Sequence, residues 1–212
     1  MKILPKSFYD RPTLKVAQDL LGSFLYAKSA TSLRRCSARV CECAHANNNE
    51  ATKVIKYKIV ETEAYVGPND LASHASRGRT KRNEVMFGEP GIIYVYFTYG
   101  MHYMLNIVTE KKGYPAAVLI RAVEQSCSAP PLRKTRDTNG PAKLTKTLGI
   151  DKKFNGKPIY TKKYGLWIED RKEILKSSQV VKAKRIGIDY AGNYKEKLWR
   201  FYIKGNNFVS RK

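Results

Sequence analysis

The densest run of apolar residues lies near the middle of the chain and predicts a β-hairpin. Residues 92–98 are nearly all β-branched or aromatic, which favours a strand, and residues 102–108 form a second run of this kind. Gly100 lies between the two runs and permits the chain to reverse, which places Tyr99 at or beside the tip of the hairpin.

The tyrosines of this hairpin follow the period of a strand. Tyr94 and Tyr96 have the same parity and are expected on one face, whereas Tyr99 has the opposite parity. Two interpretations fit this spacing. The rings pack in the core, or they line the wall of a binding site while Tyr99 projects from the end.

A second strand is predicted over residues 57–65, and it carries two carboxylates. Alternation places five side chains on one face, those of Tyr57, Ile59, Glu61, Glu63 and Tyr65. A carboxylate beside a tyrosine at the end of an apolar strand is costly to bury unless it is paired or used. The segment is therefore either an edge strand with solvated glutamates or the support of an acid placed for general-base catalysis.

The remaining pattern predicts further strands and a few helices. Helical spacing runs from Arg11 to Leu25, with Gly22 after its last apolar repeat, and a capped helix is expected over residues 139–149. Short strands are expected at 23–26, 116–123, 166–168 and 199–203.

Neither an internal repeat nor a clean linker divides the chain. We therefore expect residues 1–212 to form a single compact domain of the mixed α/β (α+β) class. Its expected features are a curved, antiparallel-rich sheet, flanking helices and a protruding β-hairpin.

Residues 28–52 show no period and are interpreted as an insertion, flexible or partly ordered, between two strands. The segment contains Cys36, Cys41, Cys43 and His45, whose spacing lacks the paired cysteines typical of structural zinc sites. Cys127 is far away in sequence. These residues are interpreted as unpaired thiols, and neither a metal nor another cofactor is predicted.

The charge of the chain indicates a polyanionic partner. Lysine and arginine number 40 against 18 aspartate and glutamate, a net charge of +22. Nucleic acid is the first candidate and an anionic membrane surface the second, and the aromatic share of 11% favours nucleic acid because bases stack on rings. The sequence shows no apolar stretch of about eighteen residues and no secretory signal, so an intracellular protein is expected.

Basic residues gather in the segment that follows the strand with the two glutamates. Arg77, Arg79, Lys81 and Arg82 are candidate phosphate contacts, and so is Lys143 at the start of the predicted helix. His74 in the same segment is, taken alone, more typical of a structural residue. Arg121 either caps a strand with charge or orients a carboxylate or phosphate.

Taken together, several motifs resemble the alkyladenine (3-methyladenine) DNA glycosylase family, and the match spans nearly the whole chain apart from 28–52. The motifs are Glu61-Thr62-Glu63-Ala64-Tyr65 with Gly67-Pro68, His74, Arg82-Asn83, Met86-Phe87, Pro90-Gly91, Tyr94-Val95-Tyr96, Tyr99-Gly100-Met101, Asn106, Leu119-Ile120-Arg121-Ala122, Gly140-Pro141-Ala142-Lys143-Leu144 and Arg200-Phe201-Tyr202-Ile203-Lys204-Gly205.

The resemblance implies a domain that pushes its hairpin into the minor groove of duplex DNA. Tyr99, with Met101, would fill the space of an extruded nucleotide. The extruded base would lie between Tyr65 on one side and Tyr96 with His74 on the other. The backbone around Ala72 and His74 would read the base edge, and the Asn106 side chain would crowd a purine that bears a 2-amino group, which disfavours normal guanine.

The resemblance also implies the chemistry. Glu63 would activate a water for attack on C1′ of the deoxyribose, and Arg121 would help to place that water and the neighbouring phosphate. The expected activity is monofunctional hydrolysis of 3-methyladenine, 7-methylguanine, hypoxanthine or ethenoadenine from double-stranded DNA, by a monomer that needs no cofactor. The expected location is the cytoplasm or nucleoid in a bacterium and the nucleus in a eukaryote.

Three alternatives remain open from the sequence. A bifunctional glycosylase would use a lysine to form a Schiff base with the sugar. A non-catalytic protein would bind bent or damaged DNA without releasing a base. A third class is an RNA-binding module, which rests on analogy of fold alone.

Overall fold

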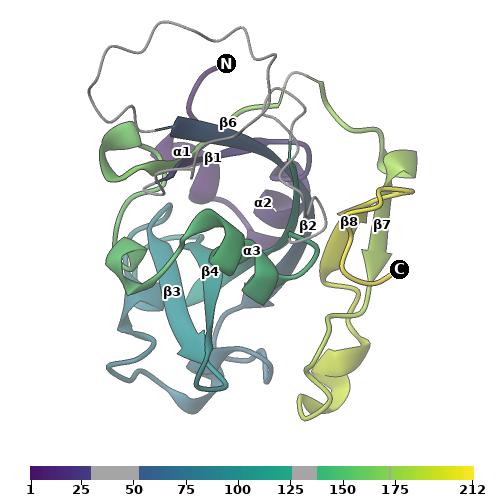
Figure 1. Cartoon of the computed structure of the whole chain (residues 1–212). Helices are drawn as coiled ribbons and strands as arrows, with labels where there is room; N and C mark the ends of the chain where they lie inside the picture. Colours follow the sequence, from purple (N-terminus) through teal and green to yellow (C-terminus); the bar gives the residue numbers. More distant parts are fainter. Residues whose placement is uncertain (30–52, 126–137, 172) are drawn as a thin grey trace, which may run out of the picture.

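The computed structural model describes residues 1–29, 53–125, 138–171 and 173–212, and its centre is an antiparallel sheet (Figure 1). The sheet has eight strands, six of them in the order β3-β4-β5-β2-β1-β6, with β8 paired to β2 and β7 paired to β8. The strands are β1 (Phe24–Ser29), β2 (Lys53–Val66), β3 (Ile93–Thr98), β4 (His102–Val108), β5 (Ala116–Gln125), β6 (Leu166–Glu169), β7 (Val180–Ala183) and β8 (Arg200–Ile203).

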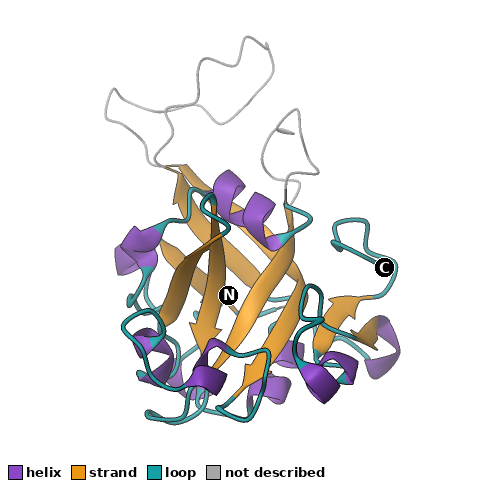
Figure 2. Cartoon of the chain, turned by 90° about the horizontal axis from the view of Figure 1, so that it is seen from below, coloured by secondary structure: helices purple, strands orange, loops and turns teal. Residues whose placement is uncertain are grey.

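The helices are short and lie around the strands (Figure 2). The α-helices are α1 (Lys6–Tyr9), α2 (Thr13–Asp19) and α3 (Pro141–Leu148), and the 3₁₀ turns are η1 (His74–Arg77), η2 (Glu84–Phe87), η3 (Lys152–Phe154), η4 (Lys162–Tyr164), η5 (Ser177–Gln179) and η6 (Gly192–Glu196). A single mixed α/β domain with an open antiparallel sheet is thus confirmed. No helix within the described residues is both long and apolar enough to span a membrane.

Strand β2 organises the sheet because it changes partners along its length. Its first part pairs with β1, and its later part, Glu61 to Glu63, pairs with β8. Strand β5 lies along the other side, and its register with β2 is interrupted on both sides of Glu61. The two carboxylates predicted from the sequence therefore lie where β8 replaces β1.

This irregularity overturns the prediction of one uniform face over residues 57–65. Tyr57 and Ile59 belong to the main core, and Val60 and Ala64 belong to the same core. A β-bulge inserts an extra residue and shifts the alternation, so the side chains after Val60 exchange faces. The two glutamates therefore point away from the core that Ile59 helps to fill.

The hydrophobic core has a large and a small part. Helix α2 packs on β2 and β5, and α3 packs on β4 and β5, and both helices contribute fully buried side chains such as Val16 and Leu144. A smaller cluster around Met86 and Tyr94 has Tyr96 packed against it. Val95, between these two tyrosines, belongs to the large core instead. The prediction that Tyr94 and Tyr96 lie on the same face of the hairpin is therefore confirmed.

The predicted hairpin is present, and its turn lies near the lower end of the view in Figure 1. At its turn, Tyr99 and Gly100 both have positive φ angles, 52° and 66°, and the amide of Met101 donates to the carbonyl of Thr98 at 3.2 Å. Glycine adopts this left-handed conformation readily, whereas a tyrosine rarely does.

Two predicted boundaries were wrong. Helix α2 ends at Asp19, because the last apolar residues of the pattern, Leu20 and Leu21, are buried in the turn that leads through Gly22 at φ 82° into β1. Strand β1 continues through Ser29, so residues 28 and 29 pair with β2 and do not belong to an insertion.

The remaining predictions concern either elements that the structure describes or residues that lie outside the described ranges. Helix α3 is confirmed with Gly149 in a left-handed cap at φ 65°, and β6 and β8 are confirmed within one residue, while β7 was not predicted. The rest of the proposed insertion, with its three cysteines and His45, lies outside the described residues, as does Cys127.

Candidate active site

A pocket opens beside the hairpin, where β2, β3, β4 and β5 meet the segment that follows β7. Its volume is about 280 Å³, just below the range of about 300–1,000 Å³ that is typical of pockets for drug-sized ligands. Its wall comes from the end of β2 with the loop and 3₁₀ turns behind it, the hairpin, β5, the first residue of α3, and residues 186–188 with Tyr190. Such a pocket suits one small, flat ring system.

The carboxylate of Glu63 lies behind this pocket and is fully buried. Its Oε2 accepts a hydrogen bond from the Tyr65 hydroxyl at 3.0 Å and lies 3.4 Å from Nη1 of Arg121. Its Oε1 accepts from the backbone amide of Ile186 at 2.9 Å. All three partners line the pocket, whereas Glu63 itself adds no surface to the wall. The carboxylate therefore contacts three residues of the pocket wall without being part of the wall itself.

Burial raises the pKa of Glu63 above its ordinary value, because removal from water penalises the charged form. The Arg121 guanidinium, the Ile186 amide and the Tyr65 hydroxyl oppose this shift. Each carboxylate oxygen can accept two hydrogen bonds; Oε1 accepts one, from Ile186, while Oε2 accepts one from Tyr65 and lies beside Arg121. The group is suited to accept a proton.

Aromatic rings from two elements form one wall. Tyr94 and Tyr96 have ring centroids 5.4 Å apart, and His74 meets Tyr96 edge-on at 4.4 Å. Nδ1 of His74 is hydrogen-bonded to the Tyr94 hydroxyl at 2.9 Å. Burial lowers the pKa of His74 to about 4, and the charge of Arg82 adds to this effect, so the imidazole is neutral near pH 7. A neutral aromatic wall attracts a cationic ring system.

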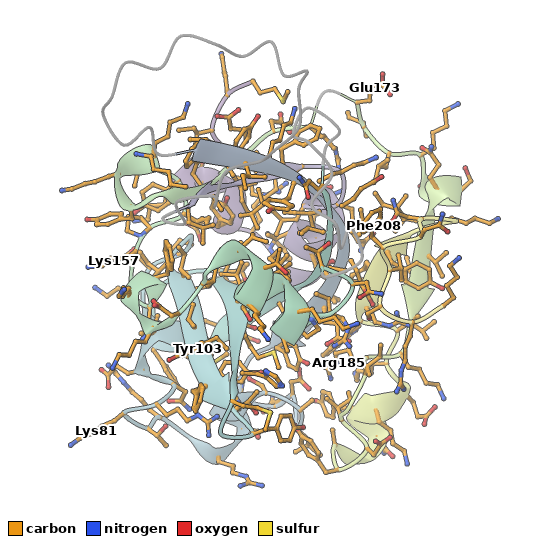
Figure 3. The ribbon with its side chains drawn as sticks, in the orientation of Figure 1. Lys81, Tyr103, Lys157, Glu173, Arg185 and Phe208 are labelled. Atoms are coloured by element: carbon orange, nitrogen blue, oxygen red, sulfur yellow. The ribbon has the colours of Figure 1, made fainter. Side chains whose placement is uncertain are left out.

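Tyr65 lines the pocket from β2, and a buried arginine lies against its ring. Cζ of Arg185 is 4.8 Å from the ring centroid, and the guanidinium donates to both oxygens of Asp70, at 2.6 and 2.8 Å. The same group donates to the carbonyl of Ala64 at 2.9 Å. Arg185, labelled in Figure 3, therefore joins the end of β2 and the loop behind it to the segment that follows β7. These contacts hold the Tyr65 ring in place.

Comparison with known proteins places this chain in a family. The family model described as methylpurine-DNA glycosylase matches residues 44–207. A protein of Methanocella arvoryzae named as a candidate 3-methyladenine DNA glycosylase is 44% identical over 220 residues, which cover 100% of this chain and 98% of that protein. Relatives of the same name are 41% identical in Clostridium perfringens (strain SM101), covering 99% of both chains, and 37% identical in Legionella pneumophila (strain Corby), covering 100% of both.

The chain belongs to the methylpurine-DNA glycosylase family. Members of such a family are DNA glycosylases, hydrolases that act on N-glycosyl bonds of DNA in base excision repair. DNA is accordingly the partner that the excess of positive charge predicted.

The hairpin of this DNA glycosylase ends in large exposed side chains. Tyr99 is 81% exposed, Met101 67% and Phe97 46%. Tyr99 also lines the pocket, and Tyr190 faces the same pocket from the segment after β7 while 69% exposed. Exposed apolar groups that gather at one place mark a surface for interaction, and these fit the predicted insertion of Tyr99 and Met101 into DNA.

The five residues predicted to contact the DNA backbone lie outside the pocket wall and are exposed. Arg82 donates to the carbonyl of Phe97 at 2.9 Å, which ties the basic loop to the hairpin. Arg79 is paired with Glu84, and Arg77 ends η1. Lys143 lies on α3, whose first residue lines the pocket. Lys81 extends away from the ribbon at the lower left of Figure 3.

The residues predicted to hold the base come together in the pocket of this glycosylase. Its wall contains Tyr65, Ala72, His74, Tyr96, Asn106, Tyr99 and Arg121. Nδ2 of Asn106 donates to the carbonyl of Tyr94 at 3.2 Å. Two of the backbone groups predicted to read the base edge already have partners: the amide of Ala72 donates to Asp70 at 3.1 Å, and the carbonyl of His74 accepts from Asn83 at 3.0 Å.

Sequence reasoning missed the part of the site that comes from the C-terminal third. Residues 186–188 and Tyr190 line the pocket, and Arg185 lies against Tyr65, although no function was predicted for this region from the sequence. A usable signal was the run Ile186-Gly187-Ile188 within a basic stretch. Among the residues that the structure describes, no cluster of three or more His, Cys, Asp or Glu is placed to hold a metal ion.

Proposed function

We propose that the protein is a monofunctional glycosylase that removes alkylated or deaminated purines from duplex DNA. The damaged nucleotide rotates out of the helix into the pocket, and Tyr99 enters the space it leaves, which offsets part of an unstacking cost of roughly a few kcal/mol. The purine stacks between Tyr65 and Tyr96 with His74. Substrates of this class are 3-methyladenine, 7-methylguanine, hypoxanthine and ethenoadenine.

Glu63 is proposed as the general base. It takes a proton from a water whose oxygen bonds to C1′, while the bond from C1′ to the purine nitrogen breaks and its electron pair leaves with the base. An alkylated, cationic purine departs as a neutral molecule, whereas a neutral purine such as hypoxanthine departs as an anion that takes a proton from solvent water. Arg121 places the water and the adjacent phosphate, and the carboxylate stabilises positive charge that develops on the sugar. The products are a free base and an abasic site.

One observation carries the proposal: the buried carboxylate of Glu63, with its raised pKa, is hydrogen-bonded to Tyr65 and Ile186 and ion-paired with Arg121, and all three line an aromatic pocket of purine size. A protein that only bound damaged DNA would gain nothing from an acid that is costly to bury. Asn106 in the same wall supports discrimination against normal guanine, whose 2-amino group its side chain would crowd.

The test uses the full chain and oligonucleotide duplexes that each contain one of the four lesions. Alkaline cleavage at abasic sites under single-turnover conditions should reveal excision of at least one lesion and none of undamaged purines. Glu63→Gln should lower the rate by about 10²–10⁴-fold while lesion binding survives. Glu84→Gln, at an exposed glutamate, is the matched control and should retain the rate.

Two results would contradict the proposal. Absence of base release from all four lesions would support a non-catalytic binder instead. A protein–DNA adduct trapped by borohydride would indicate a lysine Schiff base and therefore a bifunctional enzyme; we expect no such adduct.

A further inference from the structure

Glu61 lies two residues before Glu63 and is equally buried, but its surroundings are different. Its Oε1 accepts from Nη1 of Arg200 at 2.8 Å and from the hydroxyl of Ser210 at 3.0 Å, and its Oε2 accepts from the amide of Ser210 at 2.7 Å. Nε of Arg121 is an additional neighbour, 3.4 Å from Oε1. Glu61 is thus occupied by donors and does not line the pocket, so it is no rival for the role of base.

Arg121 is held at both ends by this arrangement. Its Nε donates to the hydroxyl of Ser210 at 3.2 Å and lies beside Glu61, while its Nη1 lies 3.4 Å from Glu63. Its side chain is only 10% exposed, so water offers few alternative partners. A planar guanidinium fixed at two edges has little freedom to turn.

The segment after β8 brings Ser210 to this position. Nη1 of Arg200 donates to the carbonyl of Arg211 at 2.9 Å, and its Nε donates to the carbonyl of Lys184 at 2.8 Å. Val209 is buried, and Phe208, labelled in Figure 3, packs against the main core. The contact between Ser210 and Arg121 therefore belongs to an anchored structure.

We infer that Glu61 and Ser210 are positioning residues that hold Arg121 against Glu63. This inference rests on the proposed function, because it assigns to Arg121 a share in placing the water and to Glu63 the role of base. A serine hydroxyl that accepts from Arg121 and donates to Glu61 links the two groups in one chain of hydrogen bonds. Neither residue touches the pocket.

The arrangement also divides the charge of Arg121 between two carboxylates. Glu61 raises the pKa of Glu63 and Arg121 lowers it, in addition to the larger effect of burial. The ionisable or charged neighbours of Glu63 are Arg121 on β5, Glu61 and Tyr65 on β2, and Tyr96 on β3, with the amide of Ile186 as the remaining donor. Without the charge of Glu61, Arg121 pairs with Glu63 alone. The pKa of Glu63 then falls, and Glu63 becomes a weaker base.

The decisive experiment compares Ser210→Thr with Ser210→Val, two substitutions of nearly equal shape. Threonine keeps the hydroxyl and should retain single-turnover excision close to that of the unaltered protein. Valine should lower it about tenfold, the effect of one hydrogen bond to a charged group. Lesion binding and thermal stability are measured for both, and equal excision rates for the two variants would overturn the inference.

A second arm measures the pH dependence of excision by Glu61→Gln. We expect a lower maximal excision rate, and we expect the loss of rate in acid, where Glu63 becomes protonated, to occur at lower pH than in the unaltered protein. Loss of folded protein alone would lower the maximal rate and leave the pH of this acid limb unchanged. An unshifted limb contradicts the inference. If the unaltered protein excises no lesion, the proposed function itself has failed; if it excises and the Ser210 variants are alike, only the positioning role has failed.

Discussion

The hydroxyl of Tyr65 donates a hydrogen bond of 3.0 Å to the carboxylate of Glu63, so one side chain both lines the pocket and contacts the proposed base. The stacking surface and the reacting group are thereby fixed relative to each other by two residues of the same strand. Small changes to Tyr65 separate these two roles.

Tyr65→Phe should leave the stacking surface in place and remove the donor to Glu63. Because this hydrogen bond lowers the pKa of Glu63, its loss should shift the acid limb of the excision profile to higher pH. The single-turnover rate at neutral pH should fall about tenfold with little change in lesion affinity. Tyr94→Phe removes a hydroxyl that bonds His74 instead, and an equal shift of the limb in that variant would contradict this account.

His74 should make the protein less stable in mild acid. Its pKa is about 4 in the folded protein against 6.5 as the ordinary value, so the unfolded chain binds a proton in this window and the folded one does not. Stability that is present above pH 6.5 is therefore lost as the pH falls toward 4. Melting temperatures measured across this window should fall more steeply for the unaltered protein than for His74→Gln, and parallel curves would refute the assignment.

Tyr99→Asn should stabilise the hairpin while it weakens capture of the extruded nucleotide. Tyr99 has φ 52°, a conformation that asparagine adopts with less strain, and the expected gain is about 1 kcal/mol in the free energy of unfolding. Denaturant titration measures the gain, and excision from a lesion duplex measures the loss. Tyr99→Phe keeps both ring and strain and should match the unaltered protein in both measurements.

Asp70→Asn should destabilise the fold strongly. Asp70 and Arg185 are both fully buried, and removal of one charge leaves the other unpaired at a cost of about 3–5 kcal/mol. Chemical denaturation gives the change, with Glu84→Gln, which breaks the exposed pair with Arg79, as a control of small effect. Equal losses in the two variants would show that burial of the pair carries no special weight.

The local parts of the fold and site could be predicted from the sequence because they depend on near neighbours. Alternation placed Tyr94 and Tyr96 on one face of the hairpin, and the spacing of Pro141 and Gly149 gave α3. The roles of individual site residues came from the family resemblance and not from these patterns.

The remaining parts depend on contacts between distant segments. The shift of face beyond Val60 was missed because alternation assumes an unbroken ladder, whereas the register of β2 is interrupted beside Glu61. Nothing near Glu61 in sequence shows that Ser210 will reach its carboxylate. Strand β7 is only four residues long, and its pairing with β8 is what makes it a strand.

The pairing of β2 with β8 also determines when the site can exist. Glu61 and Glu63 are made before β8, and Ser210 follows Glu61 by 149 positions in the sequence. A growing chain therefore carries the proposed base without the strand that covers it. On this account the arrangement around the two carboxylates is complete only once Ser210 has been made, and chains that end before Ser210 should lack it.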